Sequence, residues 1–275
     1  MNVAAALAQA RALGLERLDA HLLLAHALQQ SRAWLVAHDD AALSPGQQQR
    51  FAADCRRRAD GEPLAYVLGE REFHGLQLQV GPAVLVPRPD TETLVDWALE
   101  LLPTLPAKAP AVVDLGTGSG AIALALKHAH PAARVCAVEL SAPALAVAQA
   151  NAERLRLDVA WQPGSWWQPL RGRHFDLAVS NPPYIAAADP HLPALRYEPL
   201  QALSPGGDGL SALQQIVQGA PAHLAPGGWL LLEHGHDQAP AVRSLLQAHG
   251  LCEVSTRLDL AGHPRCSGGQ LSRSA

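Results

Sequence analysis

The feature that most constrains the fold of this chain is an alternation of apolar runs and helical segments that begins at residue 111. Strands are expected at Ala111–Leu115, Arg134–Val138, Asp158–Gln162, Phe175–Ser180, Trp229–Glu233, Cys252–Leu258 and 264–271, and helices over 119–129, 143–155, 209–221 and 237–249. Strands that alternate with helices in this way form a parallel sheet with helices on both faces. We therefore predict a doubly wound α/β domain, and the last two strands are candidates for an antiparallel edge.

The first seventy residues show helical periodicity instead. Leu15, Leu18 and Leu22 recur at the spacing of one helix face, which predicts that this face is buried. Ser44-Pro45 is a typical helix start, with a serine cap and a proline in the first turn. We predict that residues 1–72 form a separate, small helical domain.

Residues 73–87 change to the period of a strand. Leu76–Val80 alternates apolar and polar residues, Gly81-Pro82 is a typical turn, and Val84–Val86 is a second short apolar run. These features predict a β-hairpin that connects the helical domain to a second domain, residues 88–275.

The bulk composition argues against several classes of protein. The net charge is −4, which provides no general electrostatic attraction for nucleic acid, so direct nucleic-acid binding is not expected. No apolar run approaches the roughly 20 residues that span a bilayer, and the N-terminus lacks the basic region of a secretory signal. The four cysteines show no C-x-x-C spacing, and the thirteen histidines show no zinc-ligand spacing. We expect a cytoplasmic protein with no metal site and no membrane association.

A glycine-rich turn follows the first strand of the second domain and precedes a helix. It contains Gly116, Thr117, Gly118, Ser119 and Gly120. Glycines allow a tight turn and the close approach of a ligand, and the helix start offers free N–H groups. Glu139 ends the next strand, about 20 residues further on, where a carboxylate can accept both hydroxyls of a ribose. These residues predict a nucleotide cofactor, and both NAD and S-adenosylmethionine fit the pattern.

Three nearby features concern the choice of cofactor. Asp114 lies two residues before the first glycine, where a carboxylate could help to hold a cationic methionine group, directly or through water. Trp166 follows the third strand and is the candidate for closing over an adenine ring. More decisively, the fourth strand ends in Asn181-Pro182-Pro183-Tyr184, for which a hydride-transfer enzyme has no evident use. S-adenosylmethionine is therefore the favoured cofactor.

The segment Asn181–Tyr184 lies at the carboxyl end of a strand, where ligands bind in open α/β sheets. Proline removes an N–H donor and makes the preceding residue extended, so the segment presents stiffly held carbonyl oxygens beside an aromatic ring. The Asn181 side chain and the Pro182 backbone could each accept one hydrogen of a planar NH₂ group, while Tyr184 stacks on it. Two acceptors increase the electron density on nitrogen, so the pattern predicts an N-methyltransferase. Asn181, Pro182 and Tyr184 are its expected catalytic residues, and Pro183 joins them in contacting the substrate.

Further segments complete a distinctive set, which comprises Val113–Gly120, Glu139–Ser141, Ser180–Ile185, Pro87–Glu92, Asp189–Leu192, Glu198–Leu210 and Gly228–Gly235. With them, nearly the whole chain resembles the protein-(glutamine) methyltransferases that act on bacterial peptide chain release factors. The resemblance implies a Rossmann-like class I S-adenosylmethionine-dependent methyltransferase domain, preceded by a helical domain that docks the release factor. It also implies methyl transfer to the side-chain amide nitrogen of the glutamine in the Gly-Gly-Gln loop of the release factor.

The resemblance also implies roles for individual residues. The segment Gly116–Gly120 would line the methionine and ribose pocket, Glu139 would hold the ribose, and Trp166 would lie against the adenine. Asn181 would contact both the cofactor and the substrate glutamine. Glu139 replaces an aspartate common in the family and keeps its carboxylate. Ser165 stands where the family usually has an acid, which weakens the case for a hydrogen bond on the adenine side.

Other functions share parts of this pattern. A nucleic-acid N-methyltransferase can use the same Asn-Pro-Pro-Tyr device, although the acidic net charge argues against it. A ribosomal-protein glutamine methyltransferase has very similar chemistry. The glycines and Glu139 alone also permit a dinucleotide-dependent oxidoreductase or an inactive cofactor-binding adaptor. Finally, Gly268-Gly269-Gln270 repeats the substrate tripeptide, which raises the hypothesis of self-methylation.

Overall fold

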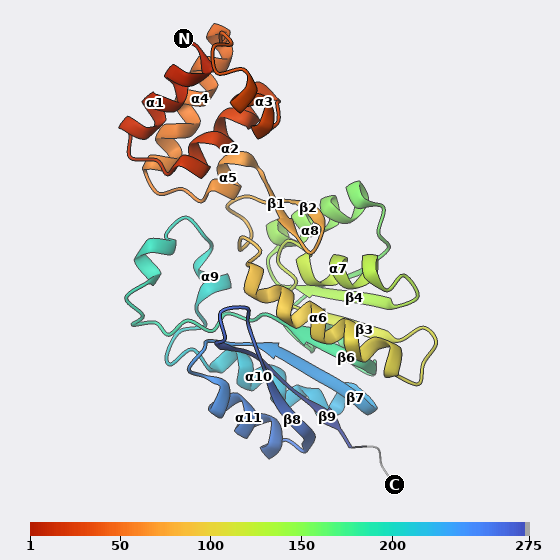
Figure 1. Cartoon of the computed structure of the whole chain (residues 1–275). Helices are drawn as coiled ribbons and strands as arrows, with labels where there is room; N and C mark the ends of the chain where they lie inside the picture. Colours follow the sequence, from red (N-terminus) through yellow and green to blue (C-terminus); the bar gives the residue numbers. More distant parts are fainter. Residues whose placement is uncertain (273–275) are drawn as a thin grey trace. The chain divides into compact units, whose positions relative to one another are not determined.

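The structure of the protein, a computed structural model, describes residues 1–272. The chain divides into two compact units, Met1–Glu70 and a second that begins at Arg71 (Figure 1). The first unit is helical, as predicted, and Ser44 caps its fourth helix. Its helices are α1 (Val3–Ala12), α2 (Arg17–Leu28), α3 (Arg32–Ala37), α4 (Pro45–Ala59) and α5 (Leu64–Leu68).

The first unit buries a different face of α2 from the one predicted. Leu23 and Leu24 are fully buried, whereas Leu18 is 49% exposed and Leu22 is only partly buried. The expectation that Leu18 and Leu22 point into the core is therefore wrong. Because three leucines are consecutive here, helical spacing fits two adjacent faces equally well. The choice between them depends on packing against partners such as Phe51 of α4, which belongs to the same core cluster.

The second unit is built on a seven-stranded sheet with the order β5-β4-β3-β6-β7-β9-β8. Its strands are β3 (Ala111–Leu115), β4 (Arg134–Glu139), β5 (Ala160–Pro163), β6 (Phe175–Ser180), β7 (Leu224–Glu233), β8 (Leu251–Leu258) and β9 (Pro264–Leu271). The strands β3 to β7 are parallel to one another, whereas β9 lies between β7 and β8 and is antiparallel to both. The doubly wound sheet and its antiparallel edge are thus confirmed.

Helices cover both faces of this sheet (Figure 1). α6 (Glu92–Leu101), α7 (Ala121–Ala129) and α8 (Ala142–Leu155) lie on one face, and α10 (Ser211–Gly219) and α11 (Ala239–Ala248) lie on the other. The connections contain short helical turns: η1 (Pro89–Thr91), η2 (Leu102–Thr104), η3 (Gln168–Leu170), η4 (Leu192–Leu195), α9 (Leu200–Leu203) and η5 (Ala220–Ala222). Successive strand residues enter opposite cores: Val112 packs with α6 and α7, and Val113 packs with α10 and α11. Burial on both faces explains why these strands are continuous apolar runs in the sequence.

The β-hairpin forms from a different pair of strands than predicted. β2 (Leu76–Gln79) has the expected alternation of buried and exposed residues, but its partner is β1 (Glu70–Phe73). Residues 84–86 run as loop instead of forming the second strand. The turn consists of His74 and Gly75, which have φ values of 47° and 77°. Two residues with positive φ are the preferred two-residue hairpin turn, so this signal outweighs the Gly81-Pro82 turn.

Candidate active site

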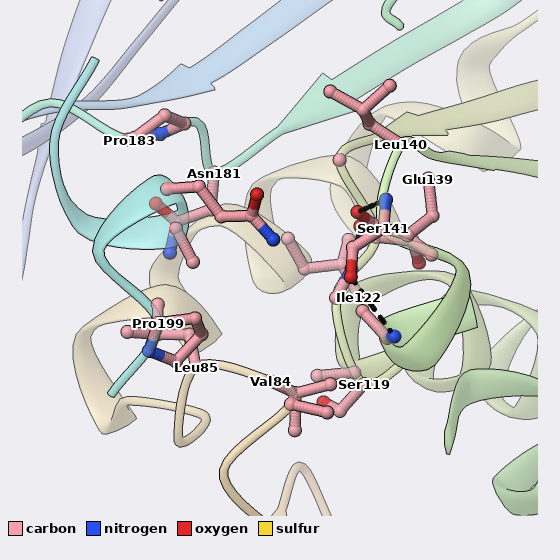
Figure 2. A pocket seen from close by; sticks show the side chains of 18 of the residues that line it. Val84, Leu85, Ser119, Ile122, Glu139, Leu140, Ser141, Asn181, Pro183 and Pro199 are labelled. Atoms are coloured by element: carbon pink, nitrogen blue, oxygen red, sulfur yellow. Dashed lines mark hydrogen bonds between the residues drawn. The ribbon is translucent and has the colours of Figure 1, made fainter. Parts of the chain in front are cut away.

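A cavity of about 190 Å³ lies where the loops that follow β3, β4, β5 and β6 come together (Figure 2). This is the edge of an open sheet where ligands are expected. The predicted site residues that line it are Gly116, Thr117, Gly118, Ser119, Glu139, Trp166, Asn181 and Pro183. Gly120, Pro182 and Tyr184 are not among the lining residues. Six separate segments of the sequence form this cavity, and the predicted residues lie in four of them; 83–91 and 199–202 complete the lining.

The glycine-rich turn is tied to the neighbouring strand by its own backbone. The N–H groups of Gly116 and Thr117 both donate to the carbonyl of Val138, at 2.9 and 3.0 Å. Gly116 has a φ of 74°, a conformation that favours glycine. A Cβ at Gly116 would lie 3.0 Å from a ring carbon of Trp166, so the indole packs directly over the glycine backbone. The absent side chain therefore makes room for the ring that forms one wall of the cavity.

Gly120 has a packing role instead. It caps the start of α7 with a φ of 86°. A Cβ there would lie 3.0 Å from the Leu124 side chain and 3.3 Å from that of Ala148. This glycine therefore brings α7 close to α8 and does not face the cavity.

The Glu139 carboxylate connects the two loops that line the cavity. One of its oxygens accepts from the Gly118 N–H at 2.9 Å, and the other accepts from the Ser141 N–H at 2.9 Å. Each carboxylate oxygen has more than one acceptor direction, so both can still accept a ligand hydroxyl. In Figure 2 the Glu139 and Ser141 side of the cavity faces Asn181. Glu139 is therefore held in place before any ligand binds.

Asp114 is completely buried beneath the glycine-rich turn and does not line the cavity. Its Oδ2 accepts from the Thr117 hydroxyl at 2.6 Å and from the Ala123 N–H at 3.2 Å, while Oδ1 has no hydrogen-bond partner among the described residues. Burial raises the pKa of Asp114 to about 7, against the lowering effect of those two hydrogen bonds. The side chain therefore fastens the turn to α7, and its surroundings favour the neutral form.

Asn181 lies at the boundary of two adjoining cavities. A smaller one, of about 80 Å³, is lined by Pro182 and Tyr184 and shares Leu85, Arg88, Asn181 and Ala202 with the larger. The Asn181 Nδ2 donates to the Thr91 hydroxyl at 3.1 Å, which leaves the carboxamide oxygen as the end available to another donor. The structure therefore brings Asn181, Pro182 and Tyr184 together in the smaller cavity, and Asn181 alone of the three also borders the larger one.

Tyr184 is anchored at both its hydroxyl and its backbone. The hydroxyl donates to Glu233 Oε1 at 3.1 Å, and the backbone carbonyl accepts from the Gln238 side chain at 3.0 Å. Burial is the largest of the effects that raise the pKa of Tyr184 above its ordinary value, so the phenol stays protonated at physiological pH. The ring is held rigidly where it borders the smaller cavity.

Sequence reasoning assigned no role to Glu198, Thr91 or Glu233, although all three lie in segments that carried the family resemblance. Glu198 is buried, accepts from the Val86 N–H at 3.0 Å and pairs with Arg88. It thereby holds the 83–88 segment, which closes one side of the cavity. A buried acid needs a partner, but the partner's identity depends on contacts across long sequence separations.

The Gly268-Gly269-Gln270 tripeptide is part of a strand, not a loop. It lies in β9 between β7 and β8, and its glutamine Nε2 donates to the Gly227 carbonyl at 2.8 Å. This amide is already hydrogen-bonded within the sheet, so the geometry does not favour self-methylation. Among residues 1–272, no group of three or more His, Cys, Asp or Glu is arranged to hold a metal ion, and none of the helices is long and apolar enough to cross a membrane.

The sheet order, the glycine-rich turn after β3 and the carboxylate after β4 define a class I S-adenosylmethionine-dependent methyltransferase domain. Residues 92–257 match the family model described as a methyltransferase small domain, and residues 2–69 match that of the PrmC N-terminal domain. The chain is 51% identical over 261 residues to the release factor glutamine methyltransferase of Bordetella pertussis, which covers 94% of this chain and 96% of that protein. The Xylella fastidiosa (strain Temecula1) enzyme of the same name is 50% identical, over 93% of this chain and 94% of its own. The chain belongs to the release factor glutamine methyltransferase family.

Solved structures with low sequence identity share the fold. The 16S rRNA N2 G1207 methyltransferase RsmC of T. thermophilus has a TM-score of 0.56 at 20% identity and covers 74% of this chain and 49% of its own. A methyltransferase from Pyrococcus furiosus has a TM-score of 0.53 at 19% identity, over 83% of this chain and 100% of its own. These similarities concern the architecture of the sheet and its helices.

Proposed function

We propose that this protein transfers a methyl group from S-adenosylmethionine to the side-chain amide nitrogen of the glutamine in the Gly-Gly-Gln motif of bacterial release factors. The observation that carries the proposal is the position of Asn181. Its side chain borders both the larger cavity, which contains the glycine-rich turn, and the smaller one, which contains Pro182 and Tyr184. A methyl donor in the larger cavity and a carboxamide in the smaller one would meet at this residue.

The residues of the larger cavity fit S-adenosylmethionine. The Glu139 carboxylate is oriented by two N–H groups and suits a ribose diol. The Trp166 ring over Gly116 offers an apolar wall of the kind that an adenine needs. Thr117, Gly118 and Ser119 line the cavity and would border the methionine part. When bound, S-adenosylmethionine supplies an electrophilic methyl group on a positively charged sulfur.

Three groups of the protein prepare the amide for attack. A carboxamide nitrogen is a weak nucleophile because its lone pair is delocalised into the carbonyl. Asn181 Oδ1 and the Pro182 carbonyl would each accept one N–H hydrogen, which increases electron density at the nitrogen and opposes its planarity. Tyr184 would shield the amide from water. The rate would then come from positioning and from preorganised acceptors. The bond between the methyl group and sulfur would break as the N–C bond forms, leaving a neutral thioether, and the nitrogen, then acidic, would lose its proton to water.

We also propose that the helical residues 1–72 dock the release factor in the cytoplasm, that 73–87 connect the domains, and that 88–275 carry out catalysis. A shallow groove between α2 and α3 supports the docking role. It is lined by Arg17, Leu18, His21, Arg32, Ala33 and Val36. Leu18 is 49% and Val36 is 71% exposed, so the groove presents two apolar side chains that a partner could cover.

The test is incubation with S-adenosylmethionine carrying a labelled methyl group and a purified release factor, followed by peptide mass analysis. We expect a single added methyl group on the motif glutamine, and no label when that glutamine is replaced by alanine. Label on the alanine variant, or transfer only to RNA added in parallel, would contradict the proposal.

A further inference from the structure

A chain of polar side chains supports the Asn-Pro-Pro-Tyr corner, and its first member, Thr91, also borders the larger cavity. Asn181 Nδ2 donates to Thr91 Oγ1 at 3.1 Å, and the Tyr184 hydroxyl donates to Glu233 Oε1 at 3.1 Å. The Thr91 hydroxyl also lowers the pKa of Glu233, so it lies near the same carboxyl group. Thr91 is 4% exposed and Glu233 is 1% exposed. Four residues from the start of α6, the end of β6 and the end of β7 thus form one buried group.

The direction of these hydrogen bonds decides which end of the Asn181 carboxamide is available. An ionised carboxylate only accepts hydrogen bonds. Glu233 Oε2 has no hydrogen-bond partner among the described residues, so it is the acceptor toward which the Thr91 hydroxyl can turn. When the Thr91 hydrogen points to Glu233, the Thr91 oxygen accepts from Asn181 Nδ2. The Asn181 oxygen is then the end that remains for the substrate.

The opposite direction would disable the site. If Glu233 became a donor, the Thr91 oxygen would accept from it, and the Thr91 hydrogen would be free to turn to Asn181. The carboxamide of Asn181 would then rotate to offer its oxygen to Thr91 and its NH₂ to the substrate. Two NH₂ groups facing each other cannot form a hydrogen bond, so the substrate amide would lose one of its two acceptors.

We propose that Thr91 and Glu233 are positioning residues that hold the Asn181 carboxamide with its oxygen toward the substrate. The proposal rests on the function proposed above and names the groups that make the Asn181 acceptor reliable. Neither residue touches the reacting atoms in this scheme. Both act through Asn181, and Glu233 also fixes the Tyr184 hydroxyl.

The same arrangement makes turnover depend on the ionisation of Glu233. Burial raises the pKa of Glu233 to about 7, while Thr91, Tyr184 and Arg265 lower it and Asp90 raises it. Cys266 faces the same carboxyl, and its own thiol pKa is well above the usual range. Above pH 7 the carboxylate accepts and the site is correctly oriented. Below pH 7 the protonated carboxyl can donate, so we expect kcat to fall on the acidic side.

The experiment compares the full-length wild type with Thr91→Val, Thr91→Ser and Glu233→Gln in release factor methylation, with S-adenosylmethionine affinity measured by calorimetry. Valine has the shape of threonine without its hydroxyl, whereas serine keeps the hydroxyl. Glutamine mimics the protonated acid because it can donate. Glu92→Gln is the matched control, since Glu92 is next to Thr91 but accepts from the His74 N–H instead.

At pH 8 we expect Thr91→Val and Glu233→Gln to lower kcat at least about tenfold, with cofactor affinity within about threefold of the wild type. Thr91→Ser and Glu92→Gln should keep kcat, and Glu233→Gln should lose the acidic fall in kcat that the wild type shows. The positioning role alone would be overturned if the wild type methylates release factor and both Thr91→Val and Glu233→Gln have the same kcat and pH profile as the wild type. A wild type that binds the cofactor but leaves release factor unmethylated would instead refute the proposed function.

Discussion

The two ends of the cavity are held in place by different means. At the glycine-rich turn, backbone N–H groups of Gly116 and Gly118 bond to the end of the adjacent strand, at Val138 and Glu139. At Asn181 the support comes from side chains distant in sequence: Thr91 is 90 positions away, and Glu233 is 49 positions from Tyr184. The first end therefore depends mainly on backbone conformation, and the second depends on particular polar atoms.

This difference predicts that substitutions at the two ends impair different steps, cofactor binding at one end and turnover at the other. A substitution at the turn should weaken cofactor binding by straining the backbone, with turnover of the bound complex little affected. A substitution at the Asn181 end should change cofactor affinity little and reduce turnover strongly, because the lost acceptor acts chiefly on the reacting amide. Cofactor affinity and turnover, measured for a substitution at each end, distinguish these two effects.

The largest effect is expected for Asn181→Ala, which removes one of the two acceptors on the substrate amide. Turnover should fall by about 10²–10³-fold, the usual effect of losing one preorganised polar group. Cofactor affinity should stay within about threefold, measured by calorimetry. Unchanged turnover would show that Asn181 has no catalytic role. A loss of cofactor affinity as large as the loss of turnover would show that the two ends of the cavity do not differ in function.

At the other end, Gly116→Ala should lower the affinity for S-adenosylmethionine by about tenfold or more. Its positive φ costs an alanine roughly 1–2 kcal/mol, and the new Cβ would press on the Trp166 ring that is 3.0 Å away. Gly118→Ala is the matched control, because its φ of 58° is also positive but nothing lies within 4 Å of its Cβ. We expect a smaller loss for Gly118→Ala in the same calorimetric titration. Equal losses of affinity in the two variants would show that backbone strain alone lowers cofactor affinity and that contact with the Trp166 indole does not contribute.

Asp114 is the exception at the backbone-held end, because its buried carboxyl fastens the turn. Its pKa is raised in the folded protein, so the folded state binds the proton more tightly than the unfolded state. Stability from this group is therefore fully present below the unfolded pKa near 4 and is lost as the pH rises to about 7. Relative to Asp114→Asn, the wild type should lose free energy of unfolding between pH 4 and 7 and show no further change above it. Urea unfolding of both proteins across this range would test the expectation, and parallel curves would contradict it.

The smallest effect on stability is expected in the helical unit, for Leu18→Asp. Leu18 is 49% exposed, so the free energy of unfolding should change by about 0.5 kcal/mol or less. Leu23→Asp is the contrast, since Leu23 is fully buried and an unpaired charge there should cost several kcal/mol. If the groove docks the release factor, Leu18→Asp should raise the KM for that substrate and leave kcat unchanged. An unaltered KM would argue against docking at this groove.

Much of the fold could be predicted because it depends on local pattern. The strands β3, β4 and β6 are largely buried on both faces and are therefore mainly apolar, and their ends agree with the predictions to within one residue. The hairpin and the buried face of α2 could not be settled in this way. In both cases two local patterns competed, and the outcome was decided by the His74-Gly75 turn and by packing between helices.

The candidate site, too, was predictable only where it depends on local sequence pattern. The sequence alone determined the glycine-rich turn, the carboxylate of Glu139 and the Asn-Pro-Pro-Tyr segment, because each follows directly from the end of a strand. Only the tertiary structure decided that Thr91 and Glu233 stand behind Asn181 and that Asp114 faces the interior. Hydrogen bonds between side chains depend on distances of a few ångströms between segments far apart in the chain, and no local pattern encodes such distances.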